Sequence, residues 1–212
     1  MNRPRAKSCP WPPVSRSEQP RPPRRAYDPA MGRHAVWLHP GDYYATAAED
    51  ETLTTVLGTC VAACIRNPHL GYGGMNHFML PASESGEWGG VPAAPRYGNY
   101  AMEILIGAVL KSGCRRNDLE IWLFGGADFG EGPLRVGEQN ALFALHYLKH
   151  EGLHPLSVDL GGSRPRVIQF TPATGAITCR LLEQPGRRIL ERERRYEAGL
   201  RAGPPGDPEP FR

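Results

Sequence analysis

The chain has 212 residues, of which 40% are hydrophobic, which suffices for one folded domain with an apolar core. It carries a net charge of +3, yet residues 1–28 hold +5 and residues 186–212 hold +2, so the part between them holds −4. No apolar stretch approaches the roughly 20 residues of a membrane helix, no secretory signal is visible, and the five cysteines lack disulfide spacing. Composition therefore argues against membrane insertion or a disulfide scaffold, and predicts a cytoplasmic protein. The basic ends come without a nucleic-acid-binding motif, so we expect no nucleic-acid partner.

The first third of the chain is predicted to be rich in strands. Residues 1–30 contain eight prolines and little apolar patterning, which predicts a disordered extension. Short apolar runs bounded by turn residues then predict strands at 43–48, 53–57, 60–66 and 73–79. Glycines and prolines make 81–97 a predicted loop.

Two helices alternate with further strands in the rest of the chain. A helix is expected at about 99–111, and a second at about 138–150 with Ala141, Leu142, Leu145 and Leu148 as its inner stripe. Strands are expected at 119–124 and 156–160, and a hairpin at 166–170 and 176–182. We therefore predict an α+β layered domain over residues 36–184, with a basic, flexible tail at 185–212 that could begin as a short helix.

Cys60 and His77 are the candidate reactive pair. Cys60 follows the small Gly58-Thr59 pair at the start of one apolar run, and His77 lies in the next run, after Gly73-Gly74. A nearby imidazole is the usual means of ionising a thiol near neutral pH. If the two runs pair as strands, they form a Cys–His nucleophile site; otherwise Cys60 is a small core residue.

Six sequence blocks resemble the CheD family of chemoreceptor glutamine deamidases. The likeness covers about residues 40–182. The blocks, in chain order, are Leu57–Ala62, Gly73–Pro81, Arg96–Met102, Phe124–Ala127, Gly137–Asn140 and Asp159–Arg164. Thr59 stands where the family usually has Ser, and Gln139 stands where Arg is common. The family's fold, a β-sandwich-like core with helices packed outside, agrees with the predicted elements.

The resemblance implies a thiol-dependent protein-glutamine glutaminase. Cys60 would be the nucleophile, His77 the acid and base, and the hydroxyl six positions before the cysteine, Thr54, would orient the imidazole. Thr55 is adjacent, and only one of the two can point to the same side of a strand. The backbone N–H groups of Thr59 or Cys60 are candidate oxyanion donors. Asn76 points away from His77 in a strand, which favours a structural hydrogen bond.

Neither a metal nor a cofactor is implied by the sequence. Cys64 lies four residues after Cys60 but has no second pair of ligands, so a core position is the simpler interpretation. His146 and His150 have the spacing of a zincin pair, yet the general-base glutamate between them is missing. Arg164 and Arg166 could contact an acidic surface, although a solvated hairpin edge is the more ordinary explanation.

The resemblance implies one principal function and one alternative. The first is deamidation of selected glutamines on the cytoplasmic helical bundle of methyl-accepting chemotaxis receptors, which supports adaptation. The alternative is a regulatory partner of a CheC-type phosphatase with little or no deamidase activity. The presence of all three candidate residues, Cys60, His77 and Thr54, favours the enzyme.

Overall fold

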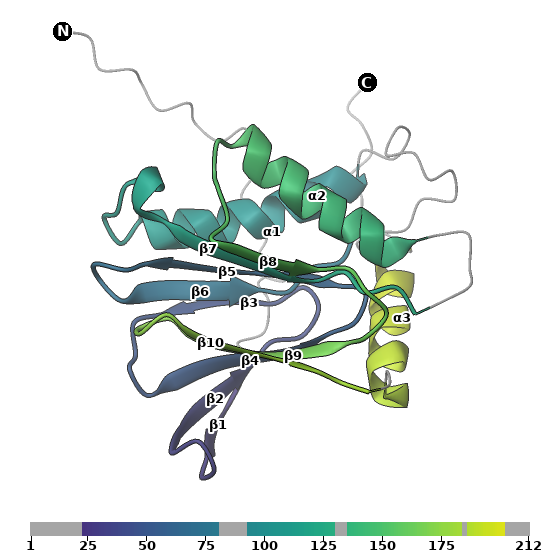
Figure 1. Ribbon diagram of the computed structural model, residues 1–212, viewed down its shortest axis with the longest axis horizontal. Coiled ribbons are helices and arrows are strands. Elements are labelled where there is room, and N and C mark those ends of the chain that lie inside the picture. The colour runs from purple at the N-terminus through teal and green to yellow at the C-terminus, as the bar shows by residue number, and fades with distance from the viewer. Residues whose placement is uncertain (1–22, 81–92, 130–134, 184–185, 202–212) are drawn as a thin grey trace, which may run out of the picture.

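The computed structural model describes residues 23–80, 93–129, 135–183 and 186–201. Two five-stranded sheets face each other, and two helices cover the outer side of one of them (Figure 1). This arrangement confirms the predicted α+β class with a sandwich-like core and two helices outside. Within the described residues, no helix is both long and apolar enough to cross a bilayer.

The first sheet is built mostly from the N-terminal and C-terminal parts of the domain. Its order is β1-β2-β4-β9-β10, and only β2 and β4 are parallel. The β9–β10 pair is the predicted hairpin, with Thr171 opposite Ala176. The strands are β1 (Arg24–Asp28), β2 (Arg33–Trp37), β4 (Glu51–Leu57), β9 (Arg166–Thr171) and β10 (Ala176–Leu181).

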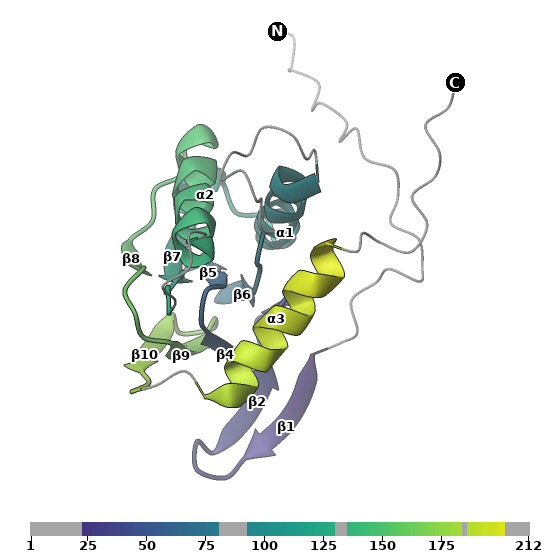
Figure 2. The ribbon, with the colours of Figure 1, turned by 90° about the vertical axis from the view of Figure 1, so that its right-hand side faces the viewer.

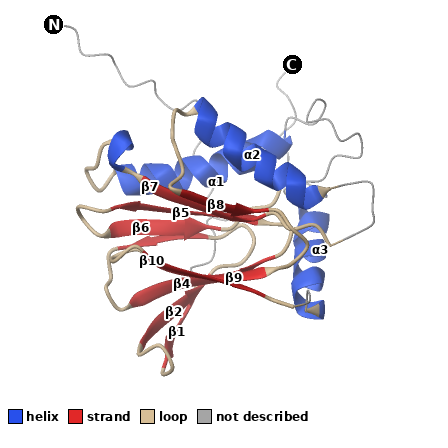
Figure 3. Ribbon diagram, in the orientation of Figure 1, coloured by secondary structure: helices blue, strands red, loops and turns tan. Residues whose placement is uncertain are grey.

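The second sheet carries the helices. Its order is β3-β6-β5-β7-β8, with only β7 and β8 parallel. Helices α1 (Ala93–Leu110) and α2 (Val136–His150) pack on its outer face, as Figure 3 shows in blue over red. The strands are β3 (Tyr43–Thr46), β5 (Val61–Asn67), β6 (Tyr72–Asn76), β7 (Glu120–Gly125) and β8 (Ser157–Leu160).

Strand β5 divides the core into two layers. Val61, Ala63 and Ile65 face the helices, whereas Ala62 and Cys64 face the first sheet. Alternate side chains of a strand point to opposite faces, so a strand that is buried on both faces has a continuous apolar sequence. This explains the unbroken apolar run after Cys60.

Helix α2 corrects one expectation. Ala141 and Leu148 are buried as predicted, but Leu142 and Leu145 are exposed. The buried face instead repeats through Gly137, Ala141, Ala144 and Leu148, at steps of three and four residues. Leu142 and Leu145 each follow a buried alanine directly, so they are turned about 100° away from the core.

The N-terminal end of the domain differs from the sequence-based expectation. Strand β1 lies inside the stretch expected to be disordered, and pairs with β2 at the sheet edge. Its side chains are mostly exposed, which explains the missing apolar pattern. At the other end, helix α3 (Arg187–Arg201) forms where the sequence left a short helix and a flexible tail as alternatives. It stands across one end of the two sheets, as the turned view in Figure 2 shows.

Candidate active site

Cys60 and His77 lie on one face of the second sheet. Val61 and Phe78 exchange two backbone hydrogen bonds of 3.0 and 2.9 Å, which extends the pairing of β5 and β6. Val61 and Phe78 face the helices, so their neighbours Cys60 and His77 project to the other side, toward the first sheet. Both side chains are buried, at 0% and 1% exposed. The structure thus brings the two predicted residues into one region.

The imidazole of His77 is held by Thr55. Thr55 Oγ1 lies 2.8 Å from His77 Nδ1 and also donates to the carbonyl of Leu38 at 2.9 Å. Since a hydroxyl has one hydrogen, the Thr55 oxygen accepts from Nδ1–H. The other ring nitrogen, Nε2, is then the basic one, and it is buried without a hydrogen-bond partner.

Thr54 is not the residue that orients His77, which corrects the prediction. Thr54 Oγ1 is buried and makes no hydrogen bond. The resemblance implied the hydroxyl six residues before the cysteine, which is Thr54. Which threonine faces His77, however, depends on the pleat of β4. Thr55 shares the inner face with Leu53 and Leu57, which pack between the two sheets, so its hydroxyl is the one that reaches the imidazole.

Cys60 and His77 are both neutral in this arrangement. Burial raises the pKa of the Cys60 thiol well above its usual value, and the nearby Glu193 carboxylate raises it further, through its charge and through a hydrogen bond. Burial also lowers the pKa of His77 to about 3, with the Arg192 charge acting in the same direction. The site therefore holds a neutral thiol and an unprotonated imidazole.

The Gly125-Gly126 segment supports the backbone around Cys60. Gly126 N–H donates to the Cys60 carbonyl at 2.7 Å, and Ala127 N–H donates to the Gly58 carbonyl at 2.9 Å. Gly125 has φ +113° and leaves no room for a Cβ against the Cys60 carbonyl. Gly125 is thus required by the close approach of β7 to the nucleophile segment, whereas a Cβ on Gly126 would lie 2.8 Å from the Gly137 carbonyl of α2.

Two asparagines fix neighbouring backbone groups. Asn140, on α2, accepts from Leu80 N–H at 2.8 Å and donates to the Thr59 carbonyl at 2.9 Å. Asn76 accepts from Ala63 N–H and donates to the Ala101 carbonyl, which confirms its structural role. Sequence reasoning gave Asn140 no role, although it belongs to one of the family-like blocks.

Helix α3 contributes a residue that sequence reasoning missed. The Glu193 carboxylate accepts hydrogen bonds from Gly58 N–H at 2.8 Å, Thr59 N–H at 3.1 Å and Thr59 Oγ1 at 3.1 Å. Glu193 is only 5% exposed. In the sequence, the charges of this segment hide the one signal available, an apolar Ile189 and Tyr196 seven residues apart with Glu193 between them.

The remaining sequence candidates lie outside this site. Cys64 packs in the layer between the sheets, and His146, His150 and His154 are exposed. Arg166 is not a solvated edge residue, because it is 2% exposed and pairs with Asp159. Across the ranges that the structure describes, no three His, Cys, Asp or Glu side chains are grouped to hold a metal ion.

Comparison with known proteins identifies close relatives. The family model described as CheD chemotactic sensory transduction matches residues 79–181. A relative from Ralstonia nicotianae is 45% identical over 82% of this chain and 75% of its own length, and one from Rhodopseudomonas palustris is 40% identical over 96% of both. Each is named a probable chemoreceptor glutamine deamidase CheD. The second match covers 96% of this chain, so it includes the segments around Cys60 and His77.

A solved structure shows a looser likeness. The crystal structure of Neisseria meningitidis protein NMB0706, assigned to the family model DUF152, has a TM-score of 0.42. It is 10% identical and covers 63% of this chain and 66% of that chain.

Proposed function

This chain belongs to the CheD family, and we propose that it is a chemoreceptor glutamine deamidase that hydrolyses glutamine side chains to glutamate through the Cys60 thiol. The names of its relatives support the substrate class. The observation that carries the mechanism is that the Val61–Phe78 pairing places the buried Cys60 and His77 on one face, while the Thr55 contact at Nδ1 leaves His77 Nε2 as the basic nitrogen.

The chemistry assigned to this pair is acyl transfer. Cys60 Sγ attacks the carboxamide carbon of the glutamine while His77 Nε2 takes the thiol proton. The same nitrogen returns that proton to the leaving amine, so ammonia departs and a thioester remains. Water, activated by Nε2, then cleaves the thioester, which yields glutamate and restores the thiol.

Backbone groups next to Cys60 supply the oxyanion site in this proposal. The attack places negative charge on the carboxamide oxygen, and donors fixed beforehand at that position stabilise it. The N–H groups of Gly58 and Thr59 each hold one of the two carboxylate oxygens of Glu193, so each marks a position at which an oxygen can bind. Asn140 and the Gly125-Gly126 turn keep this segment in place.

The test uses a purified cytoplasmic fragment of a chemotaxis receptor, incubated with the protein and analysed by peptide mass spectrometry. We expect a gain of about one dalton per modified glutamine with wild type and with Cys64→Ala, and none with Cys60→Ala, because only Cys60 is the nucleophile. Cys64 is the matched control, as it is also buried and faces the same layer. No mass change with any receptor would contradict the proposal.

Two finer parts of the resemblance stay predictions. Glutamates produced in this way would serve as methylation sites in adaptation, and a CheC-type phosphatase would be a regulatory partner. The presence of Cys60 on the same face as a His77 held by Thr55 supports an enzyme more than a partner without activity.

A further inference from the structure

The Glu193 carboxylate occupies the hydrogen-bond donors that the proposed reaction needs. It accepts hydrogen bonds from the N–H groups of Gly58 and Thr59 and from the Thr59 hydroxyl. A Cβ on Gly58 would lie 2.6 Å from each Glu193 carboxylate oxygen, so the close approach depends on this glycine. A buried carboxylate is stable only where such donors replace water. The donors around Gly58 and Thr59 therefore form a pocket that binds a carboxylate next to Cys60.

Glu193 is chemically the product of the proposed reaction. Glutamine differs from glutamate by an NH₂ group in place of one oxygen, so both side chains have the same length and shape. A glutamate carboxylate seated on the oxyanion donors, beside the nucleophile, thus has the position expected of a freshly made product.

The helix around Glu193 docks by one face. Ile189 and Glu193 are buried, and Tyr196 packs against the layer between the sheets. These three residues lie at steps of four and three along α3, which places them on one side. The Tyr196 ring also covers Gly41, where an added Cβ would lie 2.9 Å from the hydroxyl. Arg192 adds a 3.0 Å contact with His39.

Resting on the proposed function, we propose that α3 is an internal product analogue. Glu193 fills the subsite for the carboxamide of the substrate glutamine, and α3 lies on the surface that a glutamine-bearing helix of the substrate takes up. The substrate helix and α3 compete for this surface, so α3 must leave before the enzyme can act.

The state of Cys60 agrees with this assignment. Its side chain is fully buried, so a carboxamide on another protein has no access to it while the structure is closed. Beyond the effect of burial, the Glu193 charge raises the pKa of the thiol, and departure of α3 removes that charge. Release of the helix therefore opens the site and favours the thiolate together.

The first test turns the product analogue into a substrate. In the variant Glu193→Gln, the chain presents a carboxamide to its own thiol. We expect position 193 to gain about one dalton, or the chain to lose about 17 daltons as ammonia if water cannot reach the thioester. Chymotryptic cleavage after Leu190 and Tyr196 releases residues 191–196 for this measurement.

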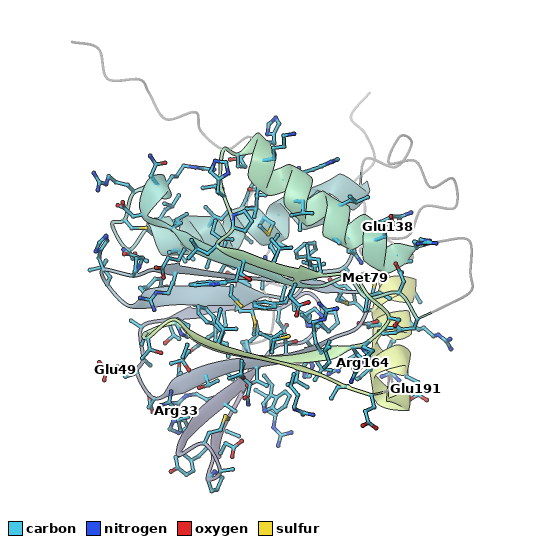
Figure 4. The ribbon with its side chains drawn as sticks, in the orientation of Figure 1. Arg33, Glu49, Met79, Glu138, Arg164 and Glu191 are labelled. Carbon is cyan, nitrogen blue, oxygen red and sulfur yellow. The ribbon has the colours of Figure 1, made fainter. Side chains whose placement is uncertain are left out.

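Matched controls lie in the same peptide. Glu191 is exposed on α3, as Figure 4 shows, so Glu191→Gln should keep its mass. Glu193→Gln combined with Cys60→Ala should also remain unchanged. Conversion of position 193 without the thiol, or equal conversion at both positions, would overturn the proposal.

The second test measures release of α3 without any substrate. Alkylation of Cys60 by iodoacetamide should be about tenfold faster in Glu193→Ala than in wild type or Glu191→Ala, since the thiol becomes accessible and more acidic. Tyr196→Ala weakens docking without touching the carboxylate and should change the rate in the same direction. Circular dichroism verifies that the variants are folded. Unchanged alkylation in both folded variants would overturn the proposal.

The two proposals fail in different ways. If the receptor fragment is deamidated equally fast by wild type and Glu193→Ala, the enzyme function stands and the role of α3 is wrong. If neither protein acts on the receptor fragment but Glu193→Gln modifies itself, the internal analogue is correct and the receptor is not the substrate.

Discussion

Helices α2 and α3 reach the same short segment, Gly58–Thr59, from different places in the sequence and with different side chains. Asn140 on α2 donates to the Thr59 carbonyl, so it holds the segment and leaves its N–H groups available. Glu193 on α3 accepts from those N–H groups and from the Thr59 hydroxyl, so it consumes them. The Asn140 amide therefore supports the candidate site through a backbone carbonyl, whereas the Glu193 carboxylate occupies its N–H donors.

The two helices also differ in the side chains that they bury. Helix α2 packs a repeated apolar face on the second sheet and belongs to the core around β5 and β7. Among the α3 side chains that the structure describes, Ile189, Glu193 and Tyr196 are the ones that dock. In the proposed competition, α3 is therefore the helix that is displaced, while α2 keeps the Gly58–Thr59 segment in place.

Among the residues that support the site, Asn140→Ala should have the largest effect on activity. It leaves the Leu80 N–H and the Thr59 carbonyl without their partner, and the free energy of unfolding should fall by roughly 1–3 kcal/mol. The shifted donors should lower kcat for receptor deamidation about a hundredfold, with little change in KM. Steady-state kinetics and urea unfolding measure the two effects. Activity near that of wild type would contradict a supporting role for α2.

Gly58→Ala should distinguish the effect of α3 on the site from that of α2. The added methyl group meets the Glu193 carboxylate at 2.6 Å, so α3 should detach while the Asn140 contacts remain. The methyl group also obstructs a substrate carboxamide, so deamidation should fall about thirtyfold. The variant should combine faster alkylation of Cys60 with slower turnover. Faster turnover would show that Gly58 serves only α3.

Thr55→Val should have an intermediate effect, and Thr54→Val supplies its control. Val lacks the hydroxyl that accepts from His77 Nδ1–H, so loss of one hydrogen bond to the imidazole should lower kcat about tenfold. Thr54 Oγ1 has no partner to lose, and its replacement should leave kcat unchanged. The reverse order of effects would restore the assignment to Thr54.

The pH dependence of stability should give the smallest effect. Burial lowers the pKa of His77 from 6.5 to about 3, so below pH 6.5 the unfolded chain binds a proton that the folded chain does not. Stability is therefore lost as the pH falls, by roughly 1 kcal/mol between pH 6.5 and about 5.5. Urea unfolding of wild type and His77→Gln at both pH values tests this, because the variant should lose less. Equal losses would show that His77 is not a buried neutral group.

Sequence patterns predicted most of the elements because local apolar periodicity decides them. The strands β4 to β7 and the β9–β10 hairpin follow the expected ranges closely, and the resemblance selected Cys60 and His77. The choice between Thr54 and Thr55 depends on the pleat of β4 against β9, and this long-range pairing leaves no mark on two adjacent threonines. Strand β1 was missed because exposed side chains dominate it. The docking of α3 was not predicted because Glu193 contacts Gly58 and Thr59, which are far away in the sequence.

The connection between β10 and α3 sets how the proposed competition responds to substrate. Only five residues separate Leu181 from Arg187, so α3 is always near its docking surface. A tether this short gives an effective concentration on the order of millimolar, which does not change when the protein is diluted. A single free substrate helix at micromolar concentration competes poorly against it, whereas substrate helices packed densely together reach comparable local concentrations. Under the proposed competition, the short tether would set the local substrate concentration at which α3 is displaced.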